Sequence, residues 1–438
     1  MRLDARGIAY RSGVYSAMSS GDPRPLLVIA YKFPPYAGVG GFRWAKLTKY
    51  LARIGHRVHV LTVPWEPTGP NAAAGLAAEP GVEIHPIASG GPHRLRHRPI
   101  ANRWLHAARH YAIRAVDSRL YWDDEAQRWP SHLLPAAHRL ISEHGIEVVV
   151  ATGHPFQANR WAAELKRQRP GLKLVQDFRD PWAENPFRPL PVRRAEAVRT
   201  WQCEALAAAD AIVSVTPRLL ALYECDAPAG TPSLVINNGA DPEAVPTDSA
   251  RTGAYEPGQT ICLTHVGNIS NGRDRPLNVL LDAIRALPPG SPRVEVWLVG
   301  AQVESVRRAH SDLERRGQLV TRPALRQCDA LRLVAASTYG LQLNAREFPF
   351  ALSTKIYEYA LLGVPVISLN YGGDVADLIA THGFGHSLDL GTGADLDALL
   401  RSLPDRAAAD RAGRFRFDVE PFTYPVLAGR YSELVQSL

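Results

Sequence analysis

The chain has 438 residues, of which 46% are hydrophobic and 21% are charged. This composition excludes a disordered chain, and the length fits two domains, each with a core of its own. Lys and Arg outnumber Asp and Glu by 50 to 43, a net charge of +7. That excess favours anionic small molecules or anionic lipid surfaces over nucleic acid, because it is small for so large a surface.

Cysteine usage and hydropathy indicate a cytoplasmic protein. The four cysteines form no Cys-x-x-Cys pair, which disfavours zinc ribbons and disulfide frameworks. No apolar run approaches the roughly 20 residues of a membrane-spanning helix, and residues 1–23 lack the apolar stretch of a secretion signal. We expect a cytoplasmic location, with peripheral contact at the inner face of the membrane left open.

After a tail at 1–24, strands and helices alternate along the chain. A buried strand at 26–30, a loop rich in Pro and Gly, a helix at 42–54 and a strand at 57–63 form a βαβ unit, which predicts a parallel sheet. The alternation continues to residue 215 and predicts an N-terminal α/β domain at 25–240. Further strands are expected at 147–151, 172–176 and 211–215, and helices at 156–168 and 192–208.

A segment rich in Arg and His interrupts this alternation and predicts a helical insertion at about 93–140. Its basic side could lie on an anionic membrane or be a solvated helix face, and the second reading is favoured because the charges form no one-sided block. A linker is expected at 241–258, because it is rich in Pro, Gly, Asp and Thr. A second α/β domain follows at 259–415, and a helix at 416–438 is expected to pack back towards the N-terminal domain.

Candidate site residues lie in the loops that follow strands, because ligands of open parallel sheets bind beyond the carboxyl ends of the strands. Gly40 and Gly41 precede a helix, where glycine lets an anion approach the backbone, although a plain tight turn explains them equally well. His154 also follows a strand, and a structural role there is commoner than a catalytic one.

Asp177, Arg179 and Asp180 follow the strand at 172–176. They are consistent with an ion pair that shapes the turn, or with contacts to a polyhydroxylated substrate. Gly267 and Arg273 follow the strand at 261–266. A glycine loop with an arginine suits a diphosphate, because guanidinium donors match phosphate oxygens; exposed arginine at a turn is the alternative.

Lys355 and Glu358 share one face of a predicted helix. Such a pair on a surface contributes little to stability. At the start of a helix that faces the ligand edge of the sheet, the ammonium group instead suits a phosphate, and the carboxylate suits vicinal hydroxyls.

The segment Lys355-Ile-Tyr-Glu358-Tyr with Gly363-Val-Pro365, supported by Phe33-Pro-Pro35, resembles the retaining glycosyltransferases of family four, also called group 1. The resemblance extends from about residue 25 to the end of the chain. It implies the GT-B fold, which is α/β with two Rossmann-like domains whose parallel sheets face each other across a cleft. It also implies transfer of a sugar from a nucleoside-diphosphate sugar to an acceptor hydroxyl with retention of anomeric configuration.

The resemblance implies a role for each candidate residue. Glu358 would bind the donor ribose, while Arg273 and Lys355 would hold and stabilise the leaving diphosphate. Gly40, Gly41 and Gly267 would let the backbone approach the donor, and His154 would lie near its sugar. The acceptor side would be lined by Asp177, Arg179 and Asp180.

No metal or other cofactor is expected, because Arg273 and Lys355 supply positive charge and Asp123-Asp124 lies outside a strand-end loop. The acceptor would be a glycan, a lipid-linked molecule or a small molecule of cell-envelope, exopolysaccharide or glycosylated-metabolite synthesis. The chain departs from the family at Phe350, where many relatives carry the first Glu of a Glu-x7-Glu pair. A sugar-nucleotide epimerase, and a degenerate protein that only binds nucleotide sugars, remain alternatives.

Overall fold

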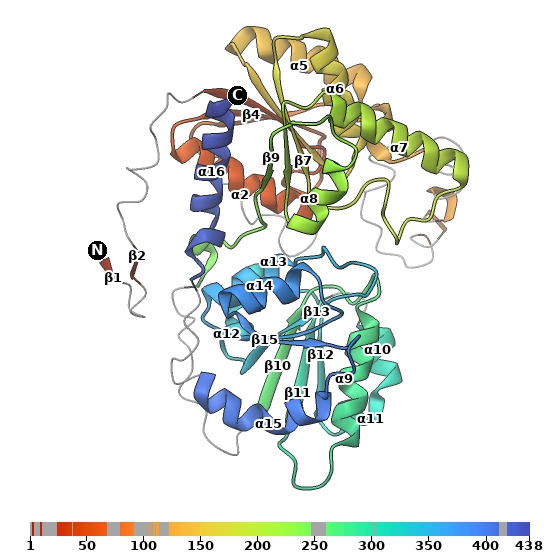
Figure 1. Ribbon diagram of the computed structural model, residues 1–438, viewed down its shortest axis with the longest axis vertical. Coiled ribbons are helices and arrows are strands. Elements are labelled where there is room, and N and C mark those ends of the chain that lie inside the picture. The colour runs from red at the N-terminus through yellow and green to blue at the C-terminus, as the bar shows by residue number, and fades with distance from the viewer. Residues whose placement is uncertain are drawn as a thin grey trace. The chain divides into compact units, whose positions relative to one another are not determined.

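The structure is a computed structural model that contains two compact units. Unit 1 is Met1–Asn237 with Pro425–Leu438, and unit 2 is Asn238–Tyr424 (Figure 1). Most of the expected tail, of 93–121 and of the expected linker lies outside the described residues. The described residues are 2–3, 9–10, 24–36, 38–67, 79–91, 105, 108–109, 111–113, 122–246, 260–300, 303–410 and 418–438.

Unit 1 is built on a parallel sheet whose seven described strands have the order β5-β4-β3-β6-β7-β8-β9. The central strands are buried along almost their whole length, as in β6, because helices cover both faces of such a sheet. The strands are β3 (Pro25–Ile29), β4 (Arg57–Thr62), β5 (Val82–Pro86), β6 (Val148–Gly153), β7 (Lys173–Phe178), β8 (Ala211–Ser214) and β9 (Ser233–Val235). A two-stranded antiparallel pair, β1 (Arg2–Leu3) and β2 (Ala9–Tyr10), precedes them.

Helices connect these strands in the order expected of βαβ units. The helix α5 (Pro130–His144) begins inside the segment expected to be an insertion, and it is the crossover helix that leads from β5 to β6. The helices of unit 1 are α2 (Val39–Arg53), the 3-10 helix η1 (Glu125–Arg128), α5 (Pro130–His144), α6 (Gln157–Gln168), α7 (Val192–Ala207), α8 (Pro217–Glu224) and nearly all of α16 (Tyr424–Ser437).

The helix α16 packs into unit 1, although it lies at the far end of the chain. The Tyr431 ring contacts the Trp44 ring of α2 edge-on, at 5.1 Å between centroids. The Ser432 hydroxyl lies 2.8 Å from His56 Nε2, just before β4. The last residues of the chain therefore complete the core of its first unit.

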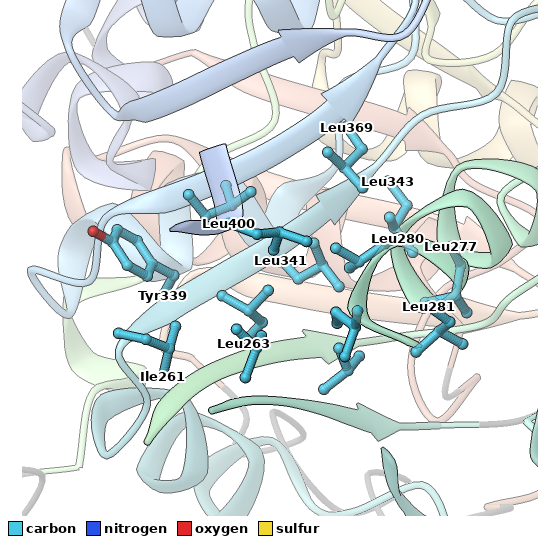
Figure 2. Packing of buried hydrophobic residues seen from close by; sticks show 14 of the residues in the cluster. Ile261, Leu263, Leu277, Leu280, Leu281, Tyr339, Leu341, Leu343, Leu369 and Leu400 are labelled. Carbon is cyan, nitrogen blue, oxygen red and sulfur yellow. The ribbon is translucent and has the colours of Figure 1, made fainter. Parts of the chain in front are cut away.

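Unit 2 has a parallel sheet whose six described strands have the order β12-β11-β10-β13-β14-β15. Leucine and isoleucine side chains of β10, β13 and α9 form its core, with Leu341 at 0% exposure (Figure 2). The strands are β10 (Ile261–Val266), β11 (Val294–Val299), β12 (Leu319–Arg322), β13 (Tyr339–Leu343), β14 (Val366–Asn370) and β15 (Gly385–Asp389). The helices are α9 (Asp274–Ala286), α10 (Glu304–Ala309), α11 (Ser311–Arg315), α12 (Gln327–Ala335), α13 (Thr354–Leu361), α14 (Asp374–His382) and α15 (Leu396–Ala409), with 3-10 turns η2 (Pro242–Ala244) and η4 (Glu420–Phe422).

Two parallel sheets covered by helices confirm the predicted α/β class. In each sheet the chain reverses its direction of travel at one point, between β3 and β6 in unit 1 and between β10 and β13 in unit 2. Ligands of open α/β sheets bind at such switch points. Within the part of the chain that the structure describes, no helix is both long and apolar enough to cross a bilayer.

Candidate functional site

The loop after β10 opens the switch point of unit 2. Gly267 has a φ of +139°, which L side chains rarely adopt, and its N–H donates to Val299 O at 2.8 Å. A Cβ on Gly300, at the end of β11, would lie 2.2 Å from Gly267 O. Two glycines at neighbouring strand ends thus let their backbones meet and turn away from the sheet.

His265, two residues before this loop, is a buried functional candidate that the sequence analysis did not assign. Its Nδ1 donates to Leu341 O at 3.0 Å, so Nε2 carries the lone pair of a neutral imidazole. Nε2 is buried and has no hydrogen-bond partner among the described residues. Burial, followed by the charges of Arg273 and Lys355, lowers the pKa of His265 to about 4.

Lys355 and Glu358 lie on the first turns of α13, which begins beyond the end of β13. Ser353 caps this helix by accepting from the Lys355 N–H. The Lys355 Nζ and Glu358 Oε2 atoms are 4.0 Å apart, and both side chains are largely buried, at 21% and 16% exposure. Gln327 Nε2, at the start of α12, donates to Glu358 Oε1 at 2.9 Å. The pair is therefore fixed in place from a neighbouring helix.

Arg273 lies on the other side of the same switch point, immediately before α9. Its Nη1 donates to Ser270 O at 3.3 Å, and the side chain is half-buried. The positive charges of Arg273 and Lys355 both lower the pKa of His265. The structure thus brings two cations and one carboxylate to the ends of β10 and β13. That set suits a diphosphate with vicinal hydroxyls beside it.

Phe350, in the segment between β13 and α13, lies where the resemblance would place a first glutamate. Phe350 is 8% exposed, and its ring packs on Phe348 at 4.8 Å between centroids. Glu347 pairs with Arg275 of α9, while its Oε2 is buried without a hydrogen-bond partner among the described residues. Its own backbone N–H, and then Arg275, lower the pKa of Glu347. A carboxylate is therefore present in this segment, three positions earlier than in the family pattern.

In unit 1, His154 follows β6 at the switch point with β3. The Lys32 ammonium, after β3, donates to His154 Nδ1 at 3.1 Å, so a neutral His154 carries its proton on Nε2. Burial, followed by the charge of Lys32, lowers the pKa of His154 well below its usual value. His154 is therefore a neutral imidazole near pH 7, and it presents an N–H donor.

Arg179 links the strand-end loops of unit 1. It donates from Nε to Gly153 O at 2.8 Å and from Nη2 to His154 O at 3.1 Å. A Cβ on Gly40 would lie 2.2 Å from Arg179 Nη2, so a side chain at this position would displace the guanidinium from where it lies. The Gly41 N–H already donates to Gly38 O at 2.9 Å. Arg179 thus holds the His154 loop against the start of α2.

Asp177 was expected to face an acceptor, but the structure places it inside unit 1. It is 0% exposed. Its two oxygens accept from Arg43 Nη2 at 3.2 Å, Thr152 Oγ1 at 3.1 Å, Trp44 Nε1 at 3.4 Å and Tyr431 OH at 2.8 Å. A buried carboxylate with four donors is a structural anchor.

The other acidic residues near these loops have different surroundings. Asp180 is exposed, and its carbonyl accepts from Tyr223 OH at 2.7 Å. Asp124 is buried and accepts from the N–H groups of Phe156 and Gln157 at 2.5 and 3.1 Å. Asp123 pairs with Arg188. These bonds fix the chain that follows His154.

No family model matches the chain, and no curated protein sequence matches it. Solved structures do match. Sucrose-phosphate synthase from Thermosynechococcus elongatus is 14% identical, with 94% of this chain and 98% of that chain covered and a TM-score of 0.60. Anabaena HepE in complex with UDP-glucose is 15% identical, with 94% and 100% covered and a TM-score of 0.55. The N-terminal domain of Candida albicans trehalose-6-phosphate phosphatase is 10% identical, with 95% and 97% covered and a TM-score of 0.62.

At identities this low, the structural matches establish a common fold, while function must be argued from the site. The similarity covers nearly the whole of both chains in each comparison. Two parallel α/β units, each with a switch point lined by glycines and polar side chains, account for it. The chain has the two-domain GT-B fold found in group 1 glycosyltransferases.

Proposed function

We propose that the chain is a retaining glycosyltransferase that moves a sugar from a nucleoside-diphosphate sugar to an acceptor hydroxyl. The observation that carries the proposal is the set at the switch point of unit 2. There Lys355 and Glu358 lie 4.0 Å apart on the first turns of α13. The positive charges of Lys355 and Arg273 both lower the pKa of buried His265. The Anabaena structure, a complex with UDP-glucose on the same fold, supports this donor class.

Each residue then has a role in the proposed reaction. Glu358 accepts hydrogen bonds from the ribose hydroxyls, with Gln327 holding its other oxygen. Arg273 and Lys355 bind the diphosphate beside Gly267. His154 donates from Nε2 to the donor sugar, and Arg179 keeps its loop in place.

The reaction breaks the bond between the anomeric carbon and the diphosphate oxygen, and the electron pair leaves with the diphosphate. The acceptor oxygen bonds to the same face of the anomeric carbon, and its proton goes to the departing phosphate oxygen. Preorganised cations lower this barrier because negative charge grows on the leaving group. Arg273 and Lys355 supply that charge, so the proposed step needs no metal ion.

We further propose a cytoplasmic reaction on a glycan, lipid-linked or small-molecule acceptor, in cell-envelope, exopolysaccharide or glycosylated-metabolite synthesis. Peripheral membrane contact through the basic segment 93–119 belongs to the same proposal, and most of that segment lies outside the described residues. Cosedimentation of the full chain with vesicles tests this contact. We expect more of the chain to sediment with vesicles of anionic lipid than with neutral vesicles.

The experiment is a thermal-shift panel of uridine, guanosine, adenosine and thymidine diphosphates with their sugar conjugates, because a ligand of the folded state raises the unfolding temperature. We expect one base to stabilise the wild-type chain and to lose its effect in Glu358→Ala. Glycosyl transfer with the donor so identified, followed by NMR of the product anomer, tests retention. Absence of any shift would refute the proposal, and isomerisation of the donor without an acceptor would favour an epimerase.

A further inference from the structure

A cluster of three histidines and one glutamate lies at the edge of the sheet of unit 1. The parallel register of β4 and β5 pairs His59 with Glu83, and His85 follows two residues later on the same face of β5. His144 ends α5, a helix that contacts β4. Segments about 25 and 60 residues apart in the sequence thus present four potential metal ligands to one place.

The ligand atoms of this cluster are close together. One ligand atom each from His59, Glu83 and His144 lies within 4.8 Å of the others. His59 Nδ1 is 3.7 Å from Glu83 Oε2 and 3.2 Å from His85 Nε2. The His59 ring stacks on the His144 ring at 4.1 Å between centroids and on the His85 ring at 5.4 Å.

His59 is the least satisfied member of the cluster. It is 1% exposed, and its Nε2 has no hydrogen-bond partner among the described residues. An unpaired buried nitrogen is unfavourable, and such groups call for an explanation.

We propose that His59, His85, His144 and Glu83 bind a divalent transition-metal ion, with Zn²⁺ as the best match. Imidazole nitrogens with one carboxylate oxygen form a donor set that zinc accepts in tetrahedral geometry, at about 2.0–2.2 Å from each ligand. Binding requires the stacked rings to turn about their side-chain bonds so that their lone pairs face the ion.

The ion acts in structure and not in sugar transfer. His59 is the third residue of β4, away from the carboxyl ends of the strands where the candidate site lies. In the described sheet β5 pairs with β4 alone. A bound ion would therefore tie this edge strand to β4 and to the end of α5. The site goes beyond the proposed function. It differs from the expectation of no metal, which rested on the cysteine pattern, on Asp123-Asp124 and on the positive charges of Arg273 and Lys355.

Zinc titration of the full, tag-free chain tests the proposal after the protein has been stripped with a chelator. Isothermal titration calorimetry gives the affinity and stoichiometry, and the visible spectrum of the Co²⁺ form reports the geometry. His144→Ala removes a ligand from a partly exposed position, and Glu83→Gln removes one from an exposed position. His132→Ala removes an exposed histidine from the same helix, α5, and is the matched control.

We expect one zinc ion per chain, with affinity lowered at least tenfold in His144→Ala and in Glu83→Gln and unchanged in His132→Ala. Zinc should raise the unfolding temperature of the wild-type chain more than that of His144→Ala. Far-UV circular dichroism confirms that each variant is folded. The proposal is overturned if the wild-type chain shows no saturable binding, or if His132→Ala weakens binding as much as His144→Ala.

Discussion

The Tyr431 hydroxyl donates a 2.8 Å hydrogen bond to Asp177 Oδ2, joining the C-terminal helix α16 to the end of β7. Both side chains are fully buried. Burial, and then the charge of Asp177, raises the pKa of Tyr431 well above its usual value, so the phenol remains a donor. Arg43 approaches the same carboxylate oxygen at 3.2 Å. This buried network ties together the start of α2, the end of β7 and α16.

Tyr431→Phe should destabilise unit 1 because it removes a donor from a buried carboxylate and adds no group in its place. We expect the free energy of unfolding to fall by about 1.5–3 kcal/mol, the scale of a hydrogen bond to a charged group. Urea denaturation measures the loss. Ser437→Ala, an exposed change at the end of the same helix, is the control and should stay within about 0.5 kcal/mol of wild type. Equal stability of the two variants would show that Asp177 does not anchor α16.

The sequence predicted the fold well where strands are buried on both faces. β3, β4, β6 and β10 are rich in buried apolar residues and are followed by loops with glycine or proline, and their boundaries were close to those expected. The strands β5, β9 and β15 were missed, because strands towards the sheet edges carry exposed polar residues and lack an apolar run. A search for continuous apolar runs detects strands that are buried on both faces, and it misses strands that are half exposed.

The site could be predicted only in part. The loops that follow strands show which residues of a sequence lie near the edge of the sheet where ligands bind. Gly267, Arg273, Lys355 and Glu358 were assigned in this way. Such a loop does not show which way a side chain points. The Asp177 side chain points into the interior of unit 1, where it accepts a hydrogen bond from Tyr431, 254 residues away. No local sequence pattern encodes this contact. The buried, unpartnered nitrogen of His265 likewise depends on tertiary packing.

Glu358→Ala should weaken binding of the donor nucleotide by about 1–3 kcal/mol, because it removes a charged acceptor for the ribose hydroxyls. Gln327 would also lose its partner. Calorimetric titration with the stabilising nucleoside diphosphate measures the effect. The control is Asp397→Asn, which neutralises an exposed carboxylate of α15 in the same unit. Unchanged affinity in Glu358→Ala would remove this residue from the site.

Lys355→Met should lower turnover far more than folding stability, because it keeps the aliphatic stem and removes only the ammonium group. We expect kcat to fall by about 10²–10³, the scale of losing one preorganised charge at a leaving group. Initial-rate kinetics, together with thermal unfolding, separate the two effects. Arg308→Met removes an exposed cation of α10 and should leave kcat unchanged. Parallel losses of kcat and stability in Lys355→Met would indicate a structural role for this residue.

His265 should make the folded state sensitive to acid. Its folded pKa of about 4 lies below the ordinary 6.5, so the unfolded chain binds more protons between these values. The stability is therefore present above pH 6.5 and is lost as the pH falls towards 4. By pH 5 this single group should remove about 2 kcal/mol. Denaturation of the wild type and of His265→Gln at pH 7 and pH 5 measures the difference, since glutamine can still donate to Leu341 O but does not titrate.

A bound diphosphate near Arg273 and Lys355 should reduce the loss by offsetting the two charges that lower this pKa. The same loss in both chains between pH 7 and pH 5 would mean that other groups, and not His265, govern the acid sensitivity.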